Sequence, residues 1–218
     1  MTPSPLRAAA SRYRGEAPSL YYYALGKIWL DPAYPAVASI LRDSPRPLLD
    51  IGCGMGLLAA YLRANGHRAP ITGLDVDGDK IALAQKLLGT EGAEFSPGDA
   101  RDLPAHQGDV VMLDVLHYFT DTQQLDLLRA IATRVAPGGT ALIRIALQQP
   151  NLRYALTQLE ESFIKLVRWI PTTGRNFPTR DEILAGFPPK EFEATVRPMW
   201  GYTPFNSYLF VFRRKPLV

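Results

Sequence analysis

The sequence predicts one α/β domain with a doubly wound, Rossmann-like sheet of seven mostly parallel strands, a C-terminal antiparallel hairpin and N-terminal accessory helices. Short apolar runs alternate with helical patterns from Leu48 to Ile145. Strands separated by helices require right-handed crossovers and a parallel sheet. Three closely spaced glycines follow the first run. Glycine lacks a Cβ, so this spacing is typical of a turn where the backbone approaches a ligand. The last two runs have no helix between them, which predicts a hairpin at one sheet edge.

The chain before the first strand predicts helices. Residues 19–43 are rich in apolar and aromatic side chains, and Pro32 and Pro35 should break them into one or two helices. Because these helices precede the first strand, they can lie only beside the sheet or over its ligand-binding edge. The 218 residues suit one domain with a full core. We divide it into N-terminal cap helices at 1–45, a cofactor-binding core at 46–146, and substrate-side helices with the hairpin at 147–218.

The central region alternates regularly between strands and helices. A strand at Leu48–Ile51 leads into a helix at Leu57–Asn65, which Gly66 ends. Pro137–Gly139 predicts the turn before the fifth strand. The other expected elements of the core are strands at 70–75, 93–96, 109–113 and 140–145 and helices at 78–88 and 123–135.

The C-terminal region predicts two helices and the hairpin. The pattern from Asn151 to Trp169 is that of a long amphipathic helix, followed by a loop at 175–177. Thr179 and Glu182 have the spacing of a capping box, so a second helix should run from Thr179 to Ala185. The hairpin strands are expected at Glu191–Arg197 and Ser207–Arg213.

The composition excludes several classes of protein. The net charge of +3 comes largely from basic residues near the two ends, and no basic helix predicts nucleic-acid binding. Cys53 is the single cysteine, which excludes an intramolecular disulfide and fits a reducing compartment. The start lacks the apolar stretch of a signal peptide, and Lys27 interrupts the apolar run well short of the roughly 18 residues of a membrane span. We expect a cytoplasmic protein without a nucleic-acid partner.

The segment LLDIGCGMG carries the functional signal, with Asp50 ahead of Gly52, Gly54 and Gly56. A nicotinamide or flavin fingerprint is G-x-G-x-x-G, whereas the third glycine here comes one residue earlier. An acid at this place would repel a pyrophosphate but suits a cationic nucleotide that carries an amino acid. The segment resembles motif I of class I S-adenosylmethionine (SAM)-dependent methyltransferases. The resemblance implies SAM as the cofactor.

Acidic residues at successive strand ends extend this resemblance. Asp75 lies near the offset of roughly 20 residues at which an acid meets the ribose hydroxyls of a nucleotide. The alternatives are that Asp75 is a solvated loop acid or that Asp77 takes this role. The resemblance implies that Asp99 binds the adenine amino group and that Ala100 supplies a backbone N–H. The implied cofactor residues are Asp50, Gly52, Cys53, Gly54, Gly56, Asp75, Val76, Asp99, Ala100, Asp114 and Val115.

The residues after the fourth strand face both ligands in this family. The resemblance places Asp114 and Val115 beside the methionine part of the cofactor, and His117 and Tyr118 toward the acceptor. His117 is the candidate general base, because an imidazole of pKa near 6.5 accepts a proton at neutral pH. The alternative is a packing role or a contact with the substrate. No second His or Cys lies at ligand spacing, so we expect no metal site.

Acceptor specificity should come from segments outside the core. Tyr22 belongs to an aromatic cluster that would form a lid, although aromatic residues at helical spacing are more often core. Arg144 and Arg175 would hold a carboxylate or phosphate, with surface arginines as the alternative. The expected substrate-binding residues are Tyr22, Tyr118, Arg144 and Arg175.

A narrower resemblance, to methyltransferases encoded with bacterial aryl-polyene or xanthomonadin-type pigment genes, rests on the segments YALGKIWLDPAY, DVLHYF, RNFPTRDEI and PMWGYTPFNSYLFVFRR. It implies that the acceptor is a hydroxyaryl acid or its thioester on an acyl carrier protein. The competing hypotheses are a non-catalytic SAM-binding or regulatory protein and a methyltransferase that acts on a macromolecule. The sequence leaves open whether carbon, oxygen or nitrogen is methylated, and it leaves the oligomeric state open.

Overall fold

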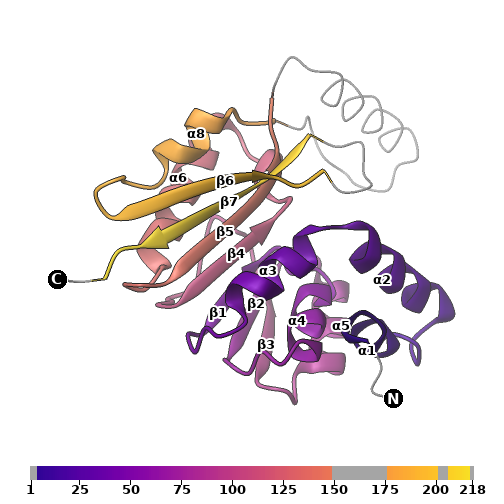
Figure 1. Cartoon of the computed structure of the whole chain (residues 1–218). Helices are drawn as coiled ribbons and strands as arrows, with labels where there is room; N and C mark the ends of the chain where they lie inside the picture. The colour runs from indigo at the N-terminus through magenta and orange to yellow at the C-terminus, as the bar shows by residue number, and fades with distance from the viewer. Residues whose placement is uncertain (1–3, 149–175, 201–205, 217–218) are drawn as a thin grey trace.

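The computed structural model describes residues 4–148, 176–200 and 206–216, and its strands form one twisted sheet (Figure 1). The seven strands follow the order β3 (Ala93–Pro97), β2 (Ile71–Asp75), β1 (Leu48–Ile51), β4 (Asp109–Leu113), β5 (Thr140–Ala146), β7 (Ser207–Arg214) and β6 (Phe192–Pro198). Strands β1 to β5 are parallel, and β7 is antiparallel to β5 and β6. The predicted doubly wound sheet with a C-terminal hairpin is confirmed.

Helices cover both faces of the sheet (Figure 1). One core cluster joins five helices to one face: α1 (Pro5–Ser11), α2 (Pro18–Leu30), α3 (Ala33–Leu41), α4 (Leu57–Ala64) and α5 (Gly78–Leu88). A second cluster joins α6 (Asp121–Arg134) and α8 (Arg180–Ala185) to the other face. Leu48 packs in the first cluster and its neighbour Leu49 in the second, because successive residues of a strand point to opposite faces.

The N-terminal region contains one helix more than the sequence predicts. Helix α1 lies before residue 19, where the predicted helices begin. The Ser4 side chain caps it by accepting from the Arg7 N–H at 3.4 Å. The hydroxyl of Tyr13, just beyond the helix, donates to the Met55 carbonyl in the glycine loop at 2.9 Å. The break that we expected around Pro32 is confirmed, since α2 ends at Leu30 and α3 begins at Ala33. Pro35 does not break the chain, because it lies in the first turn of α3, where proline is tolerated.

Local capping sets several helix starts. Helix α6 begins at Asp121, ahead of the predicted Gln123, because Thr120 and Gln123 form a reciprocal capping box. The predicted capping box of Thr179 and Glu182 is confirmed at the start of α8. The predicted helix at 151–169 lies outside the described residues. No helix in the described ranges is both long and apolar enough to cross a membrane.

Candidate functional site

The glycine loop after β1 has three left-handed glycines, with φ of 74° at Gly52, 54° at Gly54 and 78° at Gly56. A Cβ at Gly52 would lie 2.2 Å from Val115 Cγ2, and one at Gly56 would lie 2.8 Å from Leu88 Cδ1. A Cβ at Gly54 would meet only Lys80, at 4.0 Å. Protein packing therefore explains the first and third glycines. Gly54 is the one whose backbone faces open space.

Asp75, the last residue of β2, contacts the glycine loop through its carboxylate. Its Oδ2 accepts the Gly54 N–H at 2.9 Å, and its Oδ1 accepts the Asp77 N–H at 3.0 Å. Asp77 caps α5 instead, accepting from the Lys80 N–H at 3.2 Å and pairing with the Lys80 ammonium at 2.9 Å. Of the two competing acids, Asp75 is therefore the one that contacts the glycine loop.

Asp50 is a buried carboxylate beneath the same loop. Its side chain belongs to a residue that is 3% exposed, and Oδ2 has no hydrogen-bond partner within the described part of the chain. Burial, and then the charge of Asp75, raises the pKa of Asp50 to about 7. A buried carboxylate without a donor fits a ligand that brings positive charge, as the amino group and sulfonium of SAM do.

Cys53 packs beneath the loop. A Cβ at Gly73 of β2 would lie 2.9 Å from its Sγ. Burial raises the pKa of the Cys53 thiol well above its usual range, and Asp50 and Asp75 raise it further. The thiol therefore stays protonated and unreactive at neutral pH. A packing position beside the cofactor loop accounts for this residue.

The predicted cofactor residue Val76 follows β2, and the predicted adenine-binding residues Asp99 and Ala100 follow β3. Val76 is 74% exposed, and Ala100 is buried. The Asp99 carboxylate is paired with the Arg101 guanidinium, at 2.9 Å from Nε and 2.5 Å from Nη2. Hydrogen bonds from Arg101 lower the pKa of Asp99. An adenine amino group at Asp99 would share this carboxylate with Arg101.

Asp114 follows β4 in a left-handed conformation, with φ of 56°. Its carboxylate pairs with the guanidinium of Arg144 on β5. Arg144 is only 4% exposed, and its Nη1 lies 3.4 Å from Asp31 Oδ2. The sequence predicted Arg144 as a ligand for an acceptor carboxylate, but two carboxylates of the protein already pair with it. Asp31 was missed, although an acid between two apolar helices and directly before Pro32 was a readable signal.

His117 and Tyr118 lie in a short 3-10 turn, η1 (Leu116–Tyr118), after β4. The His117 ring centroid lies 4.2 Å from that of Tyr118 and 5.6 Å from that of Phe177. Its carbonyl accepts the Asn176 N–H at 2.9 Å. His117 is 6% exposed, so its ring belongs to an aromatic cluster at the end of β4. This environment favours the packing alternative over the role of a general base.

Helix α2 carries the predicted aromatic cluster. Tyr22 is 68% exposed, and Tyr23 and Trp29 are also exposed. Tyr21 instead packs against the core, with the Arg14 guanidinium 4.4 Å from its ring centroid. The cluster therefore divides between a packing residue and exposed ones. Arg175, the other predicted acceptor ligand, lies outside the described residues.

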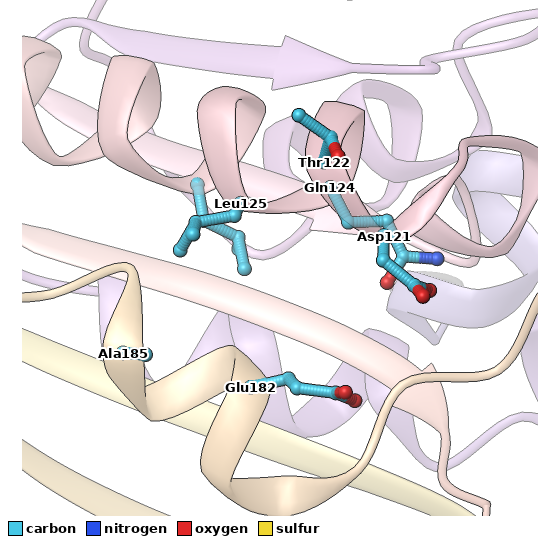
Figure 2. A pocket seen from close by; sticks show the side chains of 7 residues that line it. Asp121, Thr122, Gln124, Leu125, Glu182 and Ala185 are labelled. Carbon is cyan, nitrogen blue, oxygen red and sulfur yellow. The ribbon is translucent and has the colours of Figure 1, made fainter.

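A shallow groove of about 320 Å³ lies between α6 and α8 (Figure 2). Its acids have structural partners, since Asp121 accepts from Asn176 and Glu182 caps α8. The groove shares no residue with the predicted cofactor set, and we assign no ligand to it. In the described ranges, no group of three or more His, Cys, Asp or Glu side chains could hold a metal. The lining residues are Asp121, Thr122, Gln124, Leu125, Leu128, Glu182 and Ala185.

Comparison with known proteins shows similarity to methyltransferases in both sequence and fold. Residues 48–139 match the family model of a methyltransferase domain. The demethylmenaquinone methyltransferase of Thermotoga maritima is 25% identical over 181 residues, which cover 75% of this chain and 77% of that one. The trans-aconitate 2-methyltransferase of Mycobacterium tuberculosis is 30% identical over 145 residues, which cover 64% of this chain and 53% of that one. Magnesium protoporphyrin IX methyltransferase from Synechocystis PCC 6803, solved with bound SAH, has a TM-score of 0.65 at 19% identity, covering 84% of this chain and 82% of that one.

The fold is that of a solved methyltransferase with bound SAH, and residues 48–139 match the model of a methyltransferase domain. The assignment of SAM as the cofactor of this chain is a proposal that these matches support. The relatives with this fold carry the names of different acceptors. The acceptor of this chain is therefore a separate question, because fold alone does not fix it.

Proposed function

We propose that this protein transfers a methyl group from SAM to a small-molecule acceptor. The observation that carries the proposal is the buried Asp50 carboxylate, whose Oδ2 has no hydrogen-bond donor among the described residues, directly before a glycine loop in which Gly54 has open space beside it. Asp75 adds a second negative charge at the same edge. We propose that Gly52, Gly54, Gly56, Asp50, Cys53, Asp75, Val76, Asp99, Ala100, Asp114 and Val115 line the cofactor site.

The residues of the chain would bind and orient the reactants. SAM supplies an activated methyl group on a sulfonium, so the protein needs mainly to place the acceptor in line and exclude water. Asp50 and Asp75 would attract the positive charge of the cofactor. Val76 would cover the adenine with apolar surface, because its side chain is exposed at the tip of β2.

For the acceptor, we propose a hydroxyaryl acid or its thioester on an acyl carrier protein. The exposed rings of Tyr22 and Tyr118 support an aromatic acceptor, since they offer flat apolar surface with a polar edge. The names of relatives that act on demethylmenaquinone and trans-aconitate support a small molecule. Arg175 stays our candidate for a carboxylate, because Arg144 is already paired within the protein.

Calorimetry with SAM and with its demethylated product SAH tests the cofactor site. The wild-type protein should bind both, and Asp75→Ala should lose most of this affinity because it removes the acid that contacts the glycine loop. Asp77→Ala is the matched control. It removes a neighbouring acid and a helix cap worth about 1 kcal/mol of stability, and it should keep cofactor affinity. A wild-type protein that binds neither compound would refute the assignment.

Turnover separates an enzyme from a regulatory SAM-binding protein. Labelled SAM should give labelled product with hydroxyaryl acids, either free or linked to a carrier protein, and none with transfer RNA or bulk protein. Binding without turnover across the acceptor panel would favour the regulatory alternative. We expect His117→Ala to keep most of its turnover, since the ring is buried among Tyr118 and Phe177. If folded His117→Ala loses turnover by about a hundredfold or more, His117 acts as a general base.

A further inference from the structure

Arg144, which is buried, belongs to a row of four charged side chains that joins the cap helices to the carboxyl ends of the strands. Its guanidinium pairs with Asp114 after β4 and lies 3.4 Å from Asp31, in the corner between α2 and α3. Asp31 also pairs at 2.9 Å with Lys27, in the last turn of α2. The two cations and two carboxylates balance one another, so these four side chains together carry no net charge.

Arg144 holds Asp114 at two points. Its carbonyl accepts the Asp114 N–H at 2.9 Å, and its guanidinium pairs with the Asp114 carboxylate. Asp114 is the one non-glycine residue with positive φ in the described ranges, so its conformation depends on such contacts. The next residue, Val115, fills the space in which a Cβ at Gly52 would stand. The position of Asp114 therefore sets the surface on which the glycine loop rests.

Asp31 connects Arg144 to the cap helices. Its Oδ1 accepts the N–H of Ala33, at the start of α3, at 3.0 Å. Burial would raise the pKa of Asp31, but Arg144 and then Lys27 outweigh burial and lower that pKa. Asp31 therefore stays charged at neutral pH and keeps its hold on the guanidinium.

We propose that Arg144 is a positioning residue that couples the cap helices α2 and α3 to the glycine loop, and that it shapes the cofactor site without binding the acceptor carboxylate. The inference rests on the proposed function, because it assumes that the glycine loop holds SAM. An acceptor carboxylate at Nη1 would have to displace Asp31 or Asp114. Both carboxylates contact one nitrogen of the guanidinium, Nη1. Lysine would replace Arg144 poorly, because its ammonium is a compact, strongly hydrated charge and this side chain is almost fully buried.

Calorimetric titration with SAH tests the proposal on Arg144→Lys and Asp31→Asn. Both should weaken SAH binding roughly 3- to 30-fold. Arg63→Lys is the matched control for a buried arginine, since Arg63 donates to the carbonyls of His67 and Ala69 away from the strand ends. Asp109→Asn is the control for a buried acid, because Asp109 lies at the amino end of β4, away from the carboxyl ends of the strands. Folded controls should bind SAH within about twofold of wild type.

Amide hydrogen exchange supplies a readout that stability alone would not move. In Arg144→Lys and Asp31→Asn, exchange should rise at Cys53, Gly54 and Gly56 relative to the rest of the sheet. Unchanged SAH affinity and exchange in these variants would overturn the proposal, as would an equal loss in both controls. Asp31→Asn keeps the side-chain shape and decides the matter if Arg144→Lys does not fold. A wild-type protein without SAH affinity would instead refute the proposed function.

Discussion

At the scale of single residues, Asp50 shows how burial changes the chemistry of a side chain. The sequence places this acid at the end of a strand, where a solvated carboxylate would be unremarkable in its pKa. In the structure it is buried beside Asp75, and its pKa is raised to about 7. A ligand that brings positive charge would offset the cost of burying this carboxylate.

This environment predicts a pH dependence of stability. The pKa of Asp50 is about 7 in the folded protein against 3.8 ordinarily, so the folded state holds an extra proton between these values. The free energy of unfolding should therefore fall as pH rises through this window, by up to about 4 kcal/mol. Urea unfolding of Asp50→Asn should show a smaller fall and greater stability than wild type at pH 8. An Asp50→Asn protein less stable than wild type at pH 8 would contradict this account, and Asp109→Asn, at a hydrogen-bonded acid, should only destabilise.

At the scale of elements, the strand–loop–helix unit after β1 combines packing with ligand access. Gly52 and Gly56 let Val115 and Leu88 approach the loop, whereas Gly54 faces open space. The sequence showed that the loop needs glycines but not which glycine serves which purpose. That division depends on side chains from α5 and from the turn after β4, which come together only in the folded protein.

The glycines predict two different alanine phenotypes. Gly54→Ala should cost about 1–2 kcal/mol of stability, the ordinary price of a left-handed alanine, and should block cofactor binding. Gly56→Ala should cost more, because its Cβ would also meet Leu88 at 2.8 Å and Ala84 at 3.2 Å. Thermal unfolding and SAH calorimetry on both variants separate the effects. Undiminished SAH binding by Gly54→Ala would mean that the cofactor does not approach this face of the loop.

Elements with local signals were predictable, and those that need distant partners were not. Thr179 and Glu182 announce α8 because both capping bonds lie within four residues. The apolar pattern predicts a start at Gln123 for α6, two residues after the observed Asp121, and the capping box of Thr120 and Gln123 accounts for the difference. Helix α1 was missed because contacts with α4 and the glycine loop support it, such as the bond from Tyr13 to Met55.

At the scale of the whole molecule, the two core clusters pack different helices against the two faces of the sheet. One fixes the cap helices, α4 and α5 to the sheet, and the other fixes α6 and α8. The carboxyl ends of β1, β2 and β4 therefore open at one edge, where parallel sheets bind ligands. Asp50, Asp75 and Asp114 lie in or directly after these three strands, although the chain separates them widely. The cap reaches the same edge through Asp31.

The sequence by itself determined the fold class, most element positions, the glycine loop and the acids at the strand ends, because these follow from periodicity and short-range spacing. Only the tertiary structure decided which groups are buried and which charges meet. It paired Arg144 with Asp31 and Asp114, placed His117 among aromatic rings, and left one oxygen of Asp50 without a donor among the described residues. Desolvation and ion pairing depend on neighbours that are distant along the chain, so spacing in the sequence cannot supply them.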